Sequence, residues 1–243
     1  MSRPTAVVTG ASAGIGAATA RALAAEGFHV VVGARRQAPL AELAAQIDGT
    51  ALPLDVLDAS SVAAFVDGIG PARVLVNNAG GARGLEPVIE TAEDDWRWMW
   101  EMNVVGTLRL TRALLPRLIS SGEGHVVTVT STAALEAYDN GAGYTSAKTA
   151  QSVLHRTLRG EHLGEPVRFT EILPGMVETD FSLTRFSGDA ERAAGVYAGL
   201  TPLTADDVAE TIAFAVTRPS HVNIDQIVLR PRAQHSTLRV HRR

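Results

Sequence analysis

Short runs of β-branched residues alternate along the chain with Ala- and Leu-rich segments of helical period, and this alternation limits the possible folds most strongly. The strand-like runs cover residues 5–9, 29–32, 73–76, 125–129 and 167–172. The helical segments lie near residues 14–26, 37–47, 58–68, 93–119, 142–163 and 204–217. Strands and helices in alternation form βαβ units, whose parallel sheet is covered by helices on both faces. The pattern therefore predicts an α/β fold in one domain, residues 1–243.

Two segments interrupt the alternation. Between about 175 and 203, Phe181, Phe186 and Tyr197 stand among small and charged residues, in a connection of unusual length, so we expect a lid over a binding site. Residues 230–243 carry five arginines, two histidines and no acid. Removing the tail's charge of +5 from the total of −4 leaves −9 for the remainder, so the tail is a distinct basic element.

The composition narrows the classes of function. A net charge of −4 gives no overall attraction for nucleic acid or an anionic membrane, so a small-molecule substrate is the better expectation. No apolar run is long enough to span a bilayer and no signal-peptide pattern precedes the first strand-like run, so we expect a cytoplasmic protein. Because the chain has no cysteine, redox chemistry requires a bound cofactor, and we expect no metal site.

A glycine-rich segment at residues 9–16 follows the first strand-like run and opens the first helical segment. Glycines there permit a tight turn and let backbone N–H groups approach a pyrophosphate. Glycine-rich turns also occur for purely structural reasons, and the position between strand and helix is what favours a dinucleotide site. The predicted contacts are Gly10, Ser12, Gly14, Ile15 and Gly16.

The second strand-like run ends at Arg35 and Arg36, where dinucleotide-binding folds place an acid for the ribose hydroxyls or an arginine for a 2′-phosphate. No acid is present there. Arg35, together with Arg36 and the Ser12 hydroxyl, is suited to charge-assisted contacts with that phosphate. A solvated start of a helix is the structural alternative. We therefore predict that NADP(H) is preferred over NAD(H).

Two further loops complete this candidate cofactor site. Asp55 and Val56 are placed to receive the adenine amino group, and Asn78, Ala79 and Gly80 are placed to line the cofactor. Ligands of open α/β sheets bind at the carboxyl ends of the strands. Each loop alone could be an ordinary turn, so the prediction depends on their common edge.

Tyr144 and Lys148 lie four residues apart at the start of a predicted helix, which places both side chains on one face. A cation beside a phenol lowers the pKa of the phenol, so that tyrosine can act as an acid or base near neutral pH. Lys148 is the only lysine among 22 lysine and arginine residues, and arginine does not replace a compact ammonium group. A structural tyrosine beside a surface lysine is the alternative, but this contrast favours a catalytic pair.

Two further polar residues belong to the candidate catalytic site. Ser131, at the end of a strand-like run, is placed to hydrogen-bond a substrate oxygen and orient it for hydride transfer, although its neighbours Thr130 and Thr132 have the same chemistry. Asn103 lies inside the 93–119 helical segment, where asparagine is disfavoured. Either it bends the helix around a water molecule or the helix tolerates it.

In chain order, these residues match a known family. The matching motifs are TGASAGIG at 9–16, Asp55, NNAG at 77–80, Asn103, Ser131, Tyr144, Lys148, Pro174 and Gly175. Over residues 5–230 the sequence resembles a classical short-chain dehydrogenase/reductase. The resemblance implies a Rossmann-type, doubly wound parallel sheet of about seven strands with helices on both faces.

The same resemblance assigns roles to residues. It implies that Tyr144 is the acid/base, that Lys148 binds the nicotinamide ribose and the phenol, that Ser131 binds the substrate oxygen, and that Asn103 holds a relay water. It adds cofactor contacts by Pro174, Gly175, Val177 and Thr179, the last to the carboxamide. NADP-preferring members often carry a basic residue where this chain has Ala13, whereas Arg35 matches their usual arginine.

The C-terminal residues 222–243 resemble the branch of NADP-dependent 3-hydroxy acid and serine dehydrogenases, which implies a homotetramer whose tail reaches a neighbouring subunit. The leading expectation is therefore an NADP(H)-dependent oxidoreductase of a 3-hydroxy acid or β-hydroxy amino acid. Arg83, Arg185 or the basic tail could bind the substrate carboxylate, although each could also be a solvated charge. The alternatives are a ketoreductase of a bulkier metabolite and a non-catalytic NADP(H)-sensing regulator. We expect neither nucleic-acid nor membrane partners.

Overall fold

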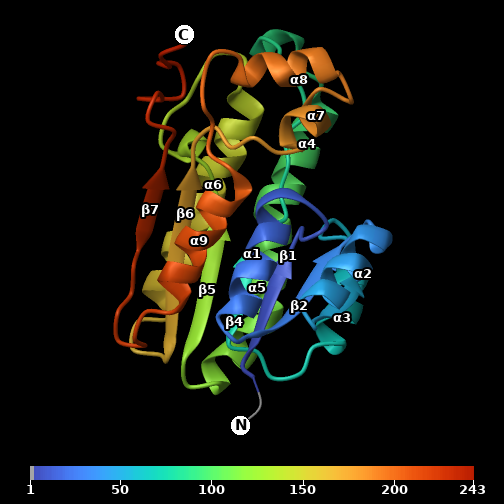
Figure 1. The fold of residues 1–243 in the computed structure, drawn as a ribbon, viewed down its shortest axis with the longest axis vertical. Helices are drawn as coiled ribbons and strands as arrows, with labels where there is room; N and C mark the ends of the chain where they lie inside the picture. The colour runs from blue at the N-terminus through green and yellow to red at the C-terminus, as the bar shows by residue number, and fades with distance from the viewer. Residues whose placement is uncertain (1–2) are drawn as a thin grey trace.

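The computed structural model describes residues 3–243, which form a seven-stranded parallel sheet with helices between the strands (Figure 1). The strands are β1 (Thr5–Thr9), β2 (His29–Ala34), β3 (Thr50–Pro53), β4 (Val74–Asn77), β5 (Gly124–Val129), β6 (Val167–Pro174) and β7 (Gln226–Leu229). Their order across the sheet is β3-β2-β1-β4-β5-β6-β7. The predicted doubly wound α/β fold is confirmed.

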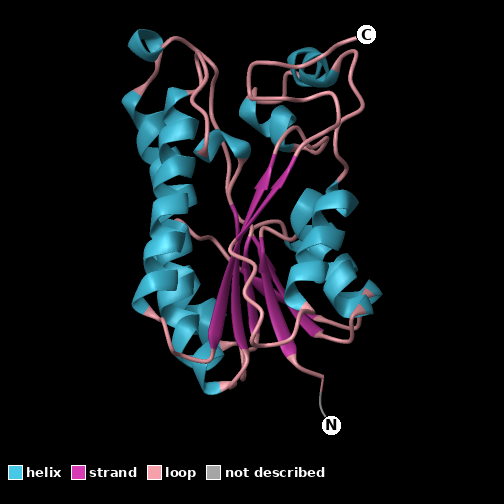
Figure 2. Ribbon diagram, turned by 90° about the vertical axis from the view of Figure 1, so that its left-hand side faces the viewer, coloured by secondary structure: helices cyan, strands magenta, loops and turns pink. Residues whose placement is uncertain are grey.

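Helices cover both faces of this sheet, which Figure 2 shows nearly edge-on between two helical layers. The longer helices are α1 (Gly14–Ala25), α2 (Gln37–Gln46), α3 (Ala59–Asp67), α4 (Glu93–Trp100), α5 (Gly106–Ser120), α6 (Ala142–Glu161) and α9 (Ala205–Val216). The shorter ones are η1 (Val88–Glu90), η2 (Glu101–Val105), η3 (Thr132–Ala134), α7 (Phe181–Arg185) and α8 (Ala190–Tyr197). None of the helices within residues 3–243 is both long and apolar enough to cross a membrane.

Each face of the sheet has its own hydrophobic core. Ala6 and Val8 of β1 pack into the core that α1, α2 and α9 cover, whereas Val7 packs into the core under α3 and α5. Successive side chains of a strand point to opposite faces, so a sheet covered on both sides requires apolar residues at every position. This requirement explains the continuous apolar runs in the sequence.

The strand-like runs of the sequence do not include two strands of the sheet. β3 and β7 are the short edge strands, and their residues are mostly half-buried or exposed. An edge strand is covered less completely than a central one, so its sequence carries a weaker apolar signal. The strand-like runs therefore predict only the five central strands.

The predicted 93–119 helix is interrupted in the structure. α4 ends at Trp100, the π-helix η2 follows over Glu101–Val105, and α5 begins at Gly106. A π-helix widens one turn of the backbone, and such turns are frequent at functional sites. Asn103 lies in this wide turn.

The two irregular segments of the sequence meet beyond the carboxyl ends of the strands, at the top of Figure 1. Residues 175–203 contain α7 and α8 there. The tail runs back against this segment: the Arg242 guanidinium donates to the Val196 carbonyl at 3.0 Å, and the Arg243 N–H donates to the Gly199 carbonyl at 2.9 Å. The tail of the chain thus contacts its own 175–203 segment.

Candidate active site

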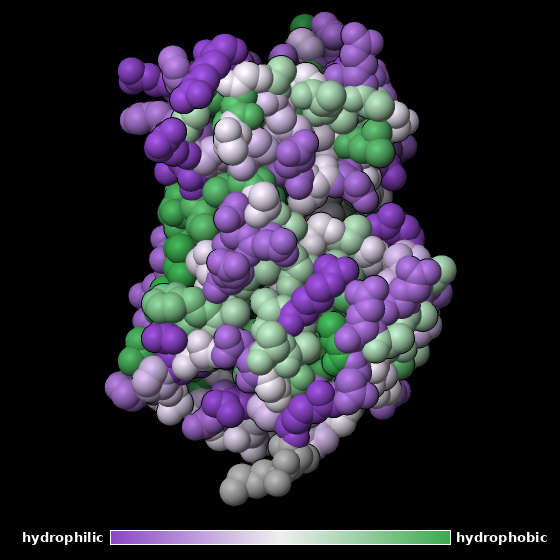
Figure 3. Space-filling model, in the orientation of Figure 1, coloured by the Kyte–Doolittle hydropathy of each residue, from purple (hydrophilic) through white to green (hydrophobic). Residues whose placement is uncertain are grey.

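A cavity of about 560 Å³ lies at the carboxyl ends of the strands, between the glycine-rich turn and the 175–203 segment. Figure 3 shows the hollow in the corresponding face of the molecule, below the part that contains α7 and α8. The predicted site residues that line it are Gly10, Gly14, Ile15, Arg36, Asn78, Ala79, Gly80, Ser131, Tyr144, Lys148, Pro174, Gly175, Val177 and Thr179. The predicted residues outside its wall are Ser12, Gly16, Arg35, Asp55, Val56 and Asn103.

The backbone of the turn after β1 adopts a conformation that requires glycine at three positions. Gly10 and Gly14 have φ angles of 65° and 54°, a region that side chains disfavour. A Cβ at Gly16 would lie 2.5 Å from the Gly10 carbonyl oxygen. Asn78 holds the turn in place, because its Nδ2 donates to the Thr9 carbonyl at 2.8 Å. The turn therefore brings bare backbone to the cavity at the start of α1, which is the shape that a pyrophosphate requires.

The two arginines after β2 differ in position. Both side chains are exposed, but only Arg36 lines the cavity, where its Nε donates to the Ser12 hydroxyl at 3.2 Å. The position of Arg35 in the motif had favoured it over Arg36 as the ligand of the 2′-phosphate. The structure instead brings Arg36 and Ser12 together at the edge of the cavity.

Asp55 and Val56 lie beyond the cavity, in the loop after β3. The Asp55 carboxylate accepts a hydrogen bond from the Leu57 N–H at 3.0 Å, and Val56 is buried beside Gly106 of α5. Their contacts with an adenine stay predictions.

Tyr144 and Lys148 project from the first turns of α6 and are both buried, with 9% and 4% of their surface exposed. The Lys148 Nζ lies 5.8 Å from the centre of the Tyr144 ring. Nζ donates to the Val129 carbonyl at 3.2 Å and to the Gln151 Oε1 at 2.8 Å. The pair is thus fixed at the inner wall of the cavity.

The expected lowering of the Tyr144 pKa by Lys148 is wrong for this structure. Burial raises the pKa of the Tyr144 phenol, and Tyr138 raises it further, whereas a hydrogen bond with Ser131 and the charge of Arg185 act against the rise. Burial also lowers the pKa of Lys148 to about 7, against the charge of Glu171. The spacing of the two residues does not reveal their burial, which penalises both charged forms. At neutral pH the phenol therefore keeps its proton.

Ser131 is distinguished from its two threonine neighbours by its partners. Its hydroxyl accepts from the Ala133 N–H at 3.1 Å and reaches the Tyr144 phenol. The Thr130 hydroxyl instead donates to the buried Glu171 carboxylate at 2.7 Å. Ser131 is therefore the strand-end hydroxyl that lies beside the Tyr144 phenol.

Asn103 is fully buried in the π-helix η2 and connects it to the loop after β4. Its Oδ1 accepts from the Gly81 N–H at 3.2 Å, and its Nδ2 donates to the carbonyls of Gly81 at 2.9 Å and Met99 at 2.7 Å. Its own carbonyl accepts from the Thr107 hydroxyl at 2.8 Å. The side chain therefore fixes backbone beside the cavity, and the relay-water role stays a prediction.

Comparison with known proteins identifies the family. The family model described as short chain dehydrogenase matches residues 4–189. The chain belongs to the short-chain dehydrogenase family. The predicted resemblance is confirmed, and the chain is an oxidoreductase of this family.

Three similar proteins match this short-chain dehydrogenase over nearly its whole length. An uncharacterized oxidoreductase of Mycobacterium tuberculosis is 64% identical over 96% of this chain and 93% of its own. The NADP-dependent 3-hydroxy acid dehydrogenase of Schizosaccharomyces pombe is 37% identical over 98% and 96%. A solved structure, the closed form of serine dehydrogenase complexed with NADP+, is 34% identical, covers 98% of this chain and 100% of its own, and superposes with a TM-score of 0.93.

Of the arginines that the sequence offers for binding a substrate carboxylate, Arg185 of α7 is the one that lines the cavity. Its guanidinium carbon lies 5.7 Å from the centre of the Tyr144 ring, and its Nη1 donates to the Tyr138 hydroxyl at 3.1 Å. Arg83 is exposed and pairs with Asp95 at 3.1 Å. No sequence motif marks Tyr138 as a site residue, because its loop reaches the cavity only in the folded chain.

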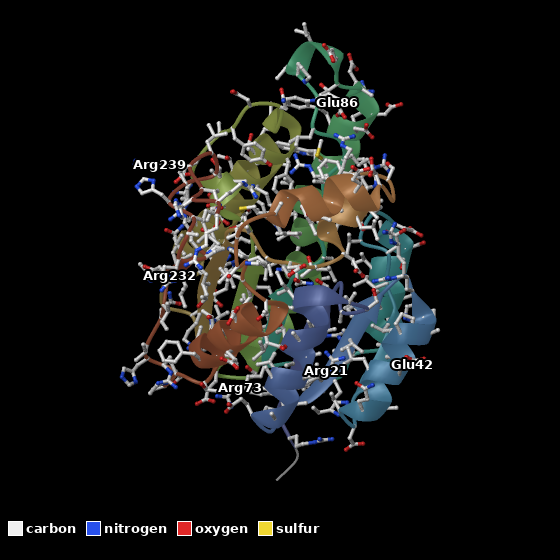
Figure 4. All side chains as sticks on the ribbon, turned by 45° about the horizontal axis from the view of Figure 1, so that its top comes forward. Arg21, Glu42, Arg73, Glu86, Arg232 and Arg239 are labelled. Carbon is white, nitrogen blue, oxygen red and sulfur yellow. The ribbon has the colours of Figure 1, made fainter. Side chains whose placement is uncertain are left out.

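The basic tail contributes uncharged side chains to the cavity wall. Gln234 is buried, and its Oε1 accepts from the Met176 N–H at 2.9 Å. Thr237 and Leu238 also line the cavity. The exposed Arg232 and Arg239 lie on the outer side of the tail (Figure 4). The tail is recognised in the sequence by its arginines, but the tail residues that line the cavity are Gln234, Thr237 and Leu238.

Proposed function

We propose that this short-chain dehydrogenase interconverts a 3-hydroxy acid or β-hydroxy amino acid and the corresponding carbonyl compound, with NADP(H) as the cofactor. The observation that carries the proposal is the position of Arg185 in the same cavity as Tyr144 and Ser131. A cation beside the acid/base suits a substrate with a carboxylate near the reacting oxygen. Relatives named as 3-hydroxy acid and serine dehydrogenases support the substrate class.

The fit of NADP(H) rests on the shape and charge of the cavity. The bare backbone at Gly10 and Gly14 leaves room for a pyrophosphate, and Arg36 with Ser12 would hold the 2′-phosphate. When bound, the nicotinamide supplies or accepts a hydride at the substrate carbon. The NADP+ complex of the similar serine dehydrogenase supports this cofactor.

The residues of the chain handle the proton and the substrate oxygen. In the direction of reduction, the Tyr144 phenol, which keeps its proton at neutral pH, donates that proton to the carbonyl oxygen. The Ser131 hydroxyl holds the same oxygen, and the Lys148 ammonium stabilises the phenolate that forms. In the direction of oxidation, the phenolate takes the proton of the substrate hydroxyl. Asn103 fixes the backbone at Gly81, which lines the same cavity.

The assembly is a further part of the proposal. We infer a cytoplasmic homotetramer that acts on small molecules, in which residues 175–203 close over the substrate and the tail also reaches a neighbouring subunit. The exposed apolar side chains Trp100, Val153 and Phe214 are suited to contacts between copies. Light scattering at four times the mass of the chain is expected, and a monomer would overturn the tetramer.

The proposed substrate class is tested by measuring turnover of an acid and of its ester, in the unmodified enzyme and in arginine variants. We expect NADP+ reduction with serine or 3-hydroxyisobutyrate, and much slower turnover of the methyl ester of the latter. Replacing Arg185→Met removes a charge-assisted hydrogen bond, so kcat/KM for the acids is expected to fall about 10- to 100-fold. The ester should lose little, and Arg83→Met is the matched surface control.

The other functions correspond to distinct outcomes of this test. Equal losses on acid and ester, or faster turnover of the ester by the unmodified enzyme, would contradict the carboxylate role of Arg185. Activity on bulky ketones without activity on any hydroxy acid would identify the ketoreductase alternative. NADP(H) binding without turnover of either class would identify a regulator.

A further inference from the structure

Gln151 is a fully buried polar residue of α6 that lies outside the cavity wall. It follows Lys148 by three residues, so both side chains lie on one face of the helix. A buried amide destabilises the fold unless its donors and acceptor find partners. The partners of Gln151 therefore indicate what this position does.

The hydrogen bonds around Gln151 have a fixed direction. A lysine ammonium only donates, so the Gln151 Oε1 must face Lys148 Nζ, at 2.8 Å. The Gln151 Nε2 then donates to the Thr107 hydroxyl at 2.8 Å, and this hydroxyl donates to the Asn103 carbonyl at 2.8 Å. A continuous series of hydrogen bonds thus connects Lys148 to the π-helix η2.

This series also determines how Lys148 is oriented. An ammonium has three N–H donors, and the protein binds two of them, through the Val129 carbonyl and Gln151. Within residues 3–243 no third acceptor bonds Nζ, and Lys148 lines the cavity. One donor therefore remains for the side of Nζ that faces the cavity and Tyr144.

The charges around Lys148 are few. From β6, Glu171 contributes a negative charge, but its carboxylate accepts hydrogen bonds from the side chains of Thr130 at 2.7 Å, Ser152 at 3.1 Å and Gln226 at 2.6 Å. Gln151 is therefore the side chain that bonds the ammonium directly, and Glu171 acts at longer range.

Three other titratable groups lie in this region, and one of them, the buried His155 of α6, is uncharged near pH 7 because burial lowers its pKa to about 4. Tyr144, on the same helix, presents its ring to Nζ, and Arg185 of α7 lies over that ring. The groups that β5, η2 and α5 present are uncharged, namely the Val129 carbonyl, Asn103 and Thr107. A change at Gln151 therefore alters the ammonium without removing another charge.

We propose that Gln151 is a positioning residue of the active site, which holds the Lys148 ammonium and is itself oriented by Thr107. This inference rests on the proposed role of Lys148 in catalysis. Gln151 touches no reacting atom, and its effect on the reaction is exerted through Lys148.

The single lysine of the chain makes a direct test possible. In protein labelled with [13Cε]lysine and free of added lysines, one side-chain signal reports the titration of Lys148. The midpoint of the cofactor-free enzyme is expected near pH 7, well below the ordinary lysine value of 10.5. Gln151→Met removes the acceptor and destabilises the charged form, so the midpoint should fall by about one pH unit. Gln151→Glu adds a negative charge, so the midpoint should rise by at least as much.

The pH dependence of kcat should shift in the same direction as the Lys148 midpoint in each variant. The alkaline limb of the kcat profile is expected to move to lower pH in Gln151→Met and to higher pH in Gln151→Glu, while KM for the hydroxy acid stays within about threefold. Thr157→Ala, at an exposed position on the same helix, is the control and should leave both midpoint and profile unchanged.

Thr107 provides a second route if a Gln151 variant does not fold. Thr107→Val removes the hydroxyl that orients the amide and should lower the Lys148 midpoint, whereas Thr107→Ser keeps the hydroxyl and should keep the midpoint. An unchanged midpoint in both Gln151 variants, or shifts of the same sign, would overturn the proposal. Because the titration needs neither cofactor nor substrate, its result is separate from failure of the proposed activity, which would appear as absent turnover in the unmodified enzyme.

Discussion

Lys148 and Tyr144 are two groups whose charged forms the protein interior disfavours, placed side by side at the inner wall of the cavity. Burial lowers the pKa of Lys148 to about 7 and raises that of Tyr144. At neutral pH, the ammonium is thus partly deprotonated and the phenol keeps its proton. A proton donor in this state is ready for carbonyl reduction, and a bound substrate or cofactor that contacts these groups will change both equilibria.

Arg36 is the residue on which cofactor preference should depend most. Replacing Arg36→Ala is expected to weaken NADPH binding about 10- to 100-fold, because a charge-assisted contact with the 2′-phosphate is lost. NADH, which lacks that phosphate, should bind nearly as before. Calorimetric titration of both cofactors checks this, with Arg35→Ala as the matched control. A larger loss of NADPH affinity in Arg35→Ala would show that the sequence assignment was the better one.

At the scale of elements, the π-helix η2 and the loop after β4 are held together by Asn103. Both groups of the Gly81 backbone bond this one buried side chain. The loop carries Gly80 and Gly81 along the cavity wall, so the wide turn of the helix contributes to the shape of the site.

The Asn103 contact should contribute strongly to stability. Asn103→Leu has a similar volume but leaves the Gly81 N–H and carbonyl without partners, so the free energy of unfolding is expected to fall by about 2–4 kcal/mol. Urea unfolding measures the change. Glu42→Ala, on the exposed surface of α2 (Figure 4), is the control and should change stability by less than about 0.5 kcal/mol. A loss that small in Asn103→Leu would contradict the proposed contact.

The sequence predicted those features that depend on residues close together in the chain. The glycine-rich turn, the central strands and the spacing of Tyr144 and Lys148 each depend on residues that are close in sequence. The π-helix, the edge strands β3 and β7, and the Gln151–Thr107 contact depend on packing between distant segments. The pKa values of Tyr144 and Lys148 also depend on burial, which the spacing of the two residues does not reveal.

At the scale of the whole molecule, the order of the strands determines where the site forms. β1 and β4 are neighbours, and their connections leave toward opposite sides of the sheet, which opens a crevice at their carboxyl ends. The 175–203 segment and the tail lie over this crevice, and Gln234 and Arg242 fasten them to each other. Tyr144 and Lys148 thus lie at the wall of the cavity next to the sheet, while the longer connections form the opposite wall.

The central claim is that Tyr144 moves the proton in an NADP(H)-dependent oxidation and reduction. The most direct measurement compares turnover of the best hydroxy acid substrate by the unmodified enzyme and by Tyr144→Phe, together with NADPH affinity. In Tyr144→Phe, kcat is expected to fall about 10²- to 10⁴-fold, while NADPH binds with nearly unchanged affinity. Retention of more than about one tenth of the turnover by Tyr144→Phe would contradict this role of Tyr144.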